Sequence, residues 1–145
     1  MAEEIKPLED YIPKGWEIIK DQDVSPTLNK VDDLELVNVF TNSEKYVVGE
    51  TVRQRGIETR PLLGFSDAVW LFNNNLNAIE QKNLFFIPEV MRSYIIVFAG
   101  TVLRDQQGER RVAHIHWCFD RWLFRFHWLD CGNFVNDWRL ACLKQ

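Results

Sequence analysis

Cysteine is scarce in this sequence, which has three copies, Cys118, Cys131 and Cys142, and no C-x-x-C spacing. An odd number at unrelated spacings indicates neither a disulfide framework nor a structural zinc knuckle. The sequence also lacks an N-x-S/T glycosylation sequon. Together these absences favour a reducing, cytoplasmic location.

Long apolar runs are missing as well. No segment approaches the roughly 18–20 apolar residues that a membrane-spanning helix requires, and the N-terminal residues MAEEIK are acidic rather than signal-like. We therefore expect the whole chain to be the mature chain, without membrane contact. Walker A and G-x-G-x-x-G patterns are also absent, which removes the usual phosphate-binding and dinucleotide-binding loops. The sequence predicts no cofactor.

Positive charge is too sparse for a duplex-binding domain. The formal net charge is -4, and residues 1–50 hold 5 basic and 12 acidic groups, whereas residues 51–145 hold 12 basic and 9 acidic groups. The C-terminal part is therefore mildly basic, without the dense Lys/Arg footprint of nucleic-acid binders. Such an asymmetry can orient an encounter with a charged partner. We expect that partner to be another protein, with an acidic protein as one option.

Aromatic residues, in contrast, are concentrated between residues 110 and 129. Two runs rich in β-branched and aromatic residues flank residues 118–121, which predicts a β-hairpin with Trp117 opposite Trp122. Side chains alternate along a strand and paired residues share a face, so the hairpin has two distinct sides. The apolar side, here called the Trp/Phe face, comprises Ala113, Ile115, Trp117, Trp122, Phe124, Phe126 and Trp128. The other side, the histidine face, comprises Val112, His114, His116, Leu123, Arg125, His127 and Leu129.

Two further strands complete the predicted sheet. Residues 94–103 are apolar on both sides, and Gly108 in the loop 105–109 favours a tight hairpin to the next strand. Residues 137–143 alternate in polarity and form a last strand, so four strands follow one another in a meander. The hairpin register puts Ile95, Val97, Ala99 and Leu103 on the Trp/Phe face, and Tyr94, Ile96, Phe98 and Val102 on the histidine face.

Two helices are predicted before this sheet. Residues 49–60 favour a short helix despite Gly56 in its interior, and its exposed face carries Arg53, Arg55, Glu58 and Arg60. Residues 65–79 have an apolar stripe at helical spacing, with Ser66 as the N-cap residue. We expect this second helix to cover the apolar strip on the histidine face. Residues 34–40 form either an edge strand or a hairpin with residues 46–48.

The predicted fold is α+β: a four- or five-stranded antiparallel meander sheet in the C-terminal half, packed against one or two N-terminal helices. A chain of 145 residues that is 46% hydrophobic has the size of one domain. We divide it into an extended lead-in at 1–30 with a short strand at 16–19, a helix-containing part at 31–92 and the antiparallel sheet at 93–145.

The tail pattern W…RW…F-W-L…W-R-L, with Gly49-Glu50…Arg53 and Pro88-Glu89 upstream, resembles that of small bacterial proteins with a Trp-rich C-terminal hairpin. The resemblance covers the chain from about Leu34 onward. It implies no activity.

His114, His116 and His127 form the constellation best suited to chemistry. Three imidazoles on one sheet face can bind a tetrahedral metal and leave a fourth position for an activated water. However, Arg125 shares the face and repels a cation, and no carboxylate on the hairpin is placed to orient an imidazole. We therefore predict no metal ligand, and a metal-dependent hydrolase or hydratase at these histidines is an alternative.

Other motifs fit structural roles better. Gly64–Ala68 departs from the G-x-S-x-G elbow at its last residue, which favours Ser66 as a helix cap. Cys131 near His127 has no oxyanion hole beside it. Single-stranded nucleic-acid binding is a second alternative, weakened because the aromatic and basic groups of the hairpin segregate to opposite faces.

The sequence thus predicts no catalytic residue and favours a non-catalytic protein-binding module, such as an adaptor, inhibitor or regulator. We expect binding to weaken with salt and to change between about pH 5.5 and 7.5, because histidines gain charge near pH 6. The helix with Arg53, Arg55 and Arg60 is the second choice for docking. The predicted docking residues combine arginine, imidazole and aliphatic groups: His114, His116, Leu123, Arg125 and His127.

Overall fold

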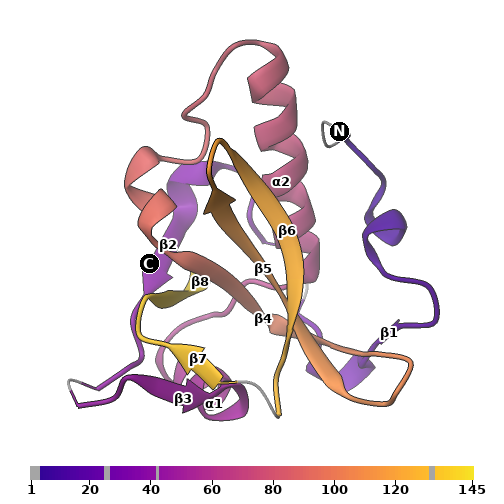
Figure 1. The fold of residues 1–145 in the computed structure, drawn as a ribbon, viewed down its shortest axis with the longest axis vertical. Coiled ribbons are helices and arrows are strands. Elements are labelled where there is room, and N and C mark those ends of the chain that lie inside the picture. The colour runs from indigo at the N-terminus through magenta and orange to yellow at the C-terminus, as the bar shows by residue number, and fades with distance from the viewer. Residues whose placement is uncertain (1–3, 25–26, 42, 131–132) are drawn as a thin grey trace.

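The computed structural model describes residues 4–24, 27–41, 43–130 and 133–145. Its fold is α+β, with a mixed, mostly antiparallel six-stranded sheet packed on helices (Figure 1). The strand order is β2-β8-β4-β5-β6, with β1 added on β4, and β3 and β7 form a separate pair. The helices are α1 (Gly49–Thr59) and α2 (Phe65–Glu80). The strands are β1 (Glu17–Ile18), β2 (Leu34–Val37), β3 (Tyr46–Val48), β4 (Ile95–Arg104), β5 (Arg110–Cys118), β6 (Arg121–Trp128), β7 (Asn133–Val135) and β8 (Trp138–Leu143).

The β4–β5–β6 meander follows the prediction. Trp117 pairs with Trp122, and Phe119 and Asp120 form the turn between the two strands. In the preceding hairpin, Gly108 has a φ of 82°, as its expected left-handed position requires. The two faces of the β5–β6 hairpin are confirmed, because Trp122 and Phe124 belong to one apolar cluster and Val112 and Leu129 to another.

β8 lies elsewhere than predicted. Instead of following β6 in the meander, it pairs in parallel with β4 and antiparallel with β2. β4 is buried along nearly its whole length, so both of its edges need hydrogen-bonded neighbours, and β8 supplies the second. β2 is an edge strand, which was one of the two predicted options. The other option is wrong, because β3 pairs with β7 and not with β2.

The predicted faces are wrong for the first half of β4. Between the pairs Phe98–Ala113 and Leu103–Arg111, β4 has four residues and β5 has one, a difference of three. An odd difference reverses the alternation of side chains between the two faces. Ile96 and Phe98 therefore lie on the Trp/Phe face and Ile95, Val97 and Ala99 on the histidine face, while Leu103 and Val102 keep their predicted sides.

α2 covers the Trp/Phe face, not the histidine face as expected (Figure 1). Phe65 and Phe72 contact Phe124, with ring centroids 6.0 and 5.7 Å apart. The irregular register of β4 explains the difference. It turns Ile96 and Phe98 toward the hairpin rings and so makes one continuous apolar surface for the helix stripe.

The side chain of Asp67, and not that of Ser66, caps the N-terminal end of α2. Gly64 is the N-cap residue, and the buried Asp67 carboxylate accepts hydrogen bonds from the backbone N–H groups of Gly64, Thr27 and Leu28. These bonds tie the lead-in to the helix. Tyr11 in the lead-in packs on Phe124 with a centroid distance of 4.9 Å, so the lead-in covers a further part of the Trp/Phe face.

α1 lies against the other side of the sheet. A Cβ on Gly56 would lie 2.4 Å from Leu140 Cδ1, so the glycine that weakens helix propensity lets α1 approach β8 closely. Arg53 was expected to be exposed, but it is buried and its Nε donates to the Ala99 carbonyl at 2.8 Å. Within the described residues, neither helix is long and apolar enough to cross a membrane.

Candidate functional site

The β5–β6 pairing brings the predicted docking residues together on the histidine face. His114 pairs with Arg125, and His116 pairs with Leu123. Their exposure differs strongly. Arg125 is exposed, His116, Leu123 and His127 are partly buried, and His114 is buried with 7% of its surface exposed. His114 is therefore not accessible to a docking partner.

Trp138 on β8 covers part of this face. Its ring centroid lies 4.8 Å from that of His127 and 5.6 Å from that of His114. Phe134 on β7 packs against Trp138 at 4.5 Å and against His127 at 5.5 Å. Two of the three histidines are thus part of an aromatic layer beneath β7 and β8.

Burial lowers the pKa of all three histidines. Desolvation, followed by the nearby His116, His127 and Arg125, lowers the pKa of His114 from 6.5 to about 3. Desolvation also lowers the pKa of His116, with Arg125 as the second cause, and that of His127, with Arg111 as the second cause. The expectation that these histidines gain charge near pH 6 is therefore wrong, because their titration is displaced to lower pH.

The three imidazoles do not converge on a metal position. The ring centroid of His114 lies 5.3 Å from that of His116 and 6.5 Å from that of His127. Within the described residues, no group of three or more His, Cys, Asp or Glu side chains is arranged to hold a metal ion. Arg125, paired with His114, adds a positive charge where a cation would bind.

The arginines in α1 and at its C-terminal end, which are the second choice for docking, already have partners. Arg55 donates to the two carboxylate oxygens of Glu44 at 2.6 and 2.8 Å, and Arg60 pairs with Glu35. The hydrogen bond from Arg55 is the main reason that the pKa of Glu44 falls to about 2. Acidic groups of the N-terminal third therefore neutralise Arg55 and Arg60.

Two further sequence candidates, the hairpin rings and Ser66, gain no functional geometry. Trp122 and Phe124 are 2% and 9% exposed beneath α2 and the lead-in, so their rings are closed to stacking with nucleic-acid bases. Ser66 lies in the first turn of α2. Cys131 lies outside the described residues.

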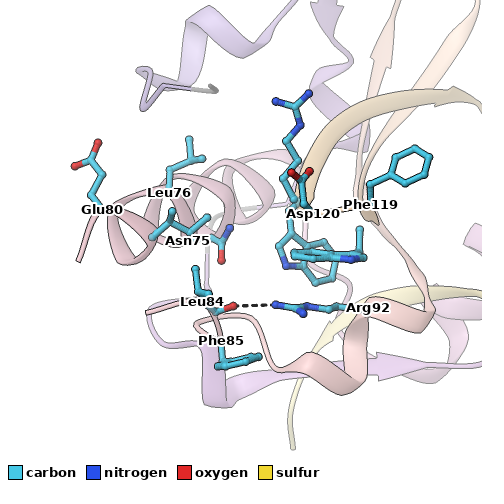
Figure 2. A pocket seen from close by; sticks show the side chains of 12 residues that line it. Asn75, Leu76, Glu80, Leu84, Phe85, Arg92, Phe119 and Asp120 are labelled. Carbon is cyan, nitrogen blue, oxygen red and sulfur yellow. Dashed lines mark hydrogen bonds between the residues drawn. The ribbon is translucent and has the colours of Figure 1, made fainter. Parts of the chain in front are cut away.

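A pocket opens at the tip of the β5–β6 hairpin, and we call it the hairpin-tip pocket (Figure 2). Its volume is about 580 Å³, within the usual range of small-molecule sites. Three segments enclose it. α2 contributes Asn75, Leu76, Ile79 and Glu80, and the segment after α2 contributes Leu84, Phe85 and Arg92. The hairpin contributes Trp117, Phe119, Asp120, Arg121 and Trp122.

The way α2 ends produces this shape. Lys82 has a φ of 64° and its N–H donates to the Ile79 carbonyl at 2.9 Å, while the Asn83 N–H donates to the Ala78 carbonyl at 2.8 Å. This Schellman motif reverses the chain at the end of the helix. The fully buried Ile87 then anchors the following segment, which brings Arg92 against the hairpin.

Three side chains in the pocket have N–H groups without an acceptor. Asn75 and Trp122 are 1% and 2% exposed, and the buried Asn75 Nδ2 and Trp122 Nε1 have no hydrogen-bond partner in the described part of the chain. The same is true of Arg92 Nε, while Arg92 Nη2 donates to the Leu84 carbonyl at 3.0 Å. Figure 2 shows this bond and the Asn75 amide, which points from α2 toward the hairpin. A buried unpaired donor costs roughly 1–3 kcal/mol. All three nitrogens are closed to solvent in this structure, so a ligand acceptor reaches them only after the side chains that cover them move.

The Arg92 guanidinium lies over an aromatic ring. Its central carbon is 3.7 Å from the Trp117 ring centroid and 5.2 Å from that of Phe85. Trp117 in turn contacts Trp122 edge to face, with centroids 5.8 Å apart. Glu89 is 3.9 Å from Arg92 Nη1, but its side chain is 71% exposed, so this ion pair is weak. The pocket therefore contains a positive charge that is only weakly compensated.

The mouth of the pocket is apolar and strained. Leu84 and Phe85 are each 56% exposed and Phe119 is 96% exposed, and exposed apolar groups that cluster in this way mark interaction sites. Phe119 has a φ of 61°, and the Asp120 N–H donates to the Cys118 carbonyl at 2.7 Å. This γ-turn geometry is unfavourable for a residue with a side chain.

Sequence reasoning missed the pocket because its walls come from three segments that only the fold brings together. Two signals were present. Asn73, Asn74 and Asn75 are poor helix formers within a helix. The first two side chains bond to the Lys6 and Trp70 carbonyls, and the third lines the pocket. The other signal was Phe119, an aromatic residue in an otherwise polar turn.

Comparison with protein-family models, with curated proteins and with solved structures finds no match for this chain.

Proposed function

We propose that the protein is a non-catalytic binding module whose site is the hairpin-tip pocket, and that it binds a small apolar molecule with hydrogen-bond acceptors. The observation that carries the proposal is a cavity of about 580 Å³ whose lining includes unpaired donors on Asn75, Arg92 and Trp122. Ligand sites typically combine apolar walls with a few polar groups that orient the ligand. A cytoplasmic location belongs to the proposal and is supported by the free thiols of Cys118 and Cys142.

The test follows the tryptophan indole N–H signals by NMR spectroscopy. The uncharged probe N-phenyl-1-naphthylamine and its anionic relative 8-anilino-1-naphthalenesulfonate are titrated separately up to their solubility limits. Either probe should shift the signals of Trp117 and Trp122, which line the pocket, and leave those of Trp16 and Trp138 in place. If neither probe shifts Trp117 and Trp122, the proposal fails.

A matched pair of variants on α2 locates the probe. Ile79→Trp adds a ring at the pocket wall, whereas Asn77→Trp adds the same ring at an exposed position outside the lining. The first change should weaken probe binding by about tenfold or more, and the second should leave it unchanged. Equal affinities of the two variants would place the probe elsewhere on the protein.

Protein docking at the histidine face is a second candidate, favoured by the exposed Arg125 beside the partly buried Leu123. Arg125→Glu should reduce co-purification of a partner from the native host, while the exposed control Arg104→Glu should not. His114 is left unchanged because a carboxylate at this buried position would destabilise the fold. Undiminished capture by Arg125→Glu would show that this face is merely solvated.

A further inference from the structure

The polar groups inside the hairpin-tip pocket are matched to one kind of head group. Within the described residues, the unpaired buried atoms of the pocket lining are Arg92 Nε, Asn75 Nδ2 and Trp122 Nε1, and all three are donors. A carboxylate is acceptor-only and has about four lone-pair sites, so it can accept from several donors at once. An alcohol or amine head would place a donor of its own among these donors.

The charges around the pocket separate its interior from its rim. Glu80, Asp120 and Arg121 line the pocket but are exposed, so solvent screens their charges. Arg92 is less exposed, with 20% of its side-chain surface accessible, and its planar fork suits a carboxylate. The interior field is therefore positive, although the rim carries both signs.

The rest of the lining is suited to hydrocarbon. Leu76, Ile79, Leu84 and Phe85 provide aliphatic and aromatic surface on two sides, and Trp117 and Trp122 provide it on the third. Figure 2 shows Leu84 and Phe85 beside Arg92, so an apolar group can continue directly from a head group held at the guanidinium. Burial of apolar area is favourable, which makes a chain or ring preferable to a second polar group at these walls.

From this arrangement we infer that the ligand of the hairpin-tip pocket, whose role in binding rests on the proposed function, is an apolar carboxylic acid. Its carboxylate pairs with the Arg92 guanidinium, and its hydrocarbon part lies against Leu76, Ile79 and Leu84. Arg92 is the residue that distinguishes an acid from a neutral molecule of the same shape.

The experiment compares decanoate with decanol, two probes of equal chain length, by NMR titration of the Trp117 and Trp122 indole signals at neutral pH. Decanoate should bind the wild type at least about tenfold more tightly than decanol. Arg92→Met keeps the aliphatic stem and removes the charge, so it should abolish this preference. Arg104→Met removes an exposed arginine outside the pocket lining and should preserve it.

A measurement on the wild type alone provides independent evidence. With decanoate labelled by carbon-13 at its carboxyl group, the pKa of the bound acid should lie below that of the free acid, because the guanidinium favours the ionised form. Equal affinities for decanoate and decanol, or an unchanged pKa of the bound acid, would overturn the carboxylate assignment. Either result would still be consistent with the proposed binding function of the pocket. Absence of binding by both probes would overturn the proposed function itself.

Discussion

Phe119 shows how a single residue can oppose local backbone preference. Its φ of 61° lies in the left-handed region, where a side chain is disfavoured, and its ring is 96% exposed and so gains little from burial. Phe119→Gly should therefore increase the free energy of unfolding by about 1 kcal/mol, measured by urea denaturation. Asp120→Gly is the matched control, because Asp120 has no positive φ and its replacement should only destabilise. A Phe119→Gly protein less stable than the wild type would show that the backbone at Phe119 is not strained.

His114 gives the residue-scale prediction for pH. Its folded-state pKa of about 3 lies below the ordinary value of 6.5, so the unfolded chain binds the proton more readily. The contribution of His114 to the free energy of unfolding is therefore fully present above pH 6.5, and it is lost as the pH falls from 6.5 toward about 3. Between pH 7 and 5 this histidine should cost about 2 kcal/mol of unfolding free energy.

The check compares urea denaturation of the wild type and His114→Gln at both pH values. The carboxylates are common to the two proteins, so the difference between them isolates the imidazole. The variant should lose less stability than the wild type on acidification. Parallel losses would show that His114 is not desolvated as described.

At the scale of elements, the end of α2 offers a stabilising substitution. Lys82 occupies the left-handed position of a Schellman motif, with a φ of 64°, where glycine is the favoured residue. Lys82→Gly should raise the midpoint of thermal unfolding, corresponding to about 1 kcal/mol. Gln81→Gly is the control, because Gln81 has a φ of -93° and gains nothing from glycine. A rise for Gln81→Gly and none for Lys82→Gly would contradict this account of the helix end.

The elements also show where sequence patterns fail. Alternation predicted the two faces of β5 and β6, because a regular two-strand pairing transmits the period of two along the hairpin. The same rule failed in β4, where three additional residues between Phe98 and Leu103 reverse the faces. The prediction for α2 depended on the faces of β4 and is therefore also wrong. α2 was expected on the histidine face and packs on the Trp/Phe face.

At the scale of the whole molecule, stability depends on the core beneath α2. Trp122 is 2% exposed and Phe124 is 9% exposed. Trp122→Ala or Phe124→Ala should each cost roughly 3–5 kcal/mol, a large part of the stability of an ordinary domain. Trp128→Ala is the control on the same face, because Trp128 is 39% exposed and its removal should cost far less. A wild-type melting temperature for Trp122→Ala would disprove the packing.

The sequence by itself determined the α+β class, the two helices, the β5–β6 hairpin with Trp117 opposite Trp122, and the division of that hairpin into two faces. These features depend on period, propensity and turn chemistry, which act between residues near one another in the chain. Tertiary structure decided the parallel pairing of β8 with β4, the burial of His114 and the hairpin-tip pocket. Each of these depends on which distant segments meet, and the burial that shifts a pKa or leaves a donor unpaired exists only after they have met.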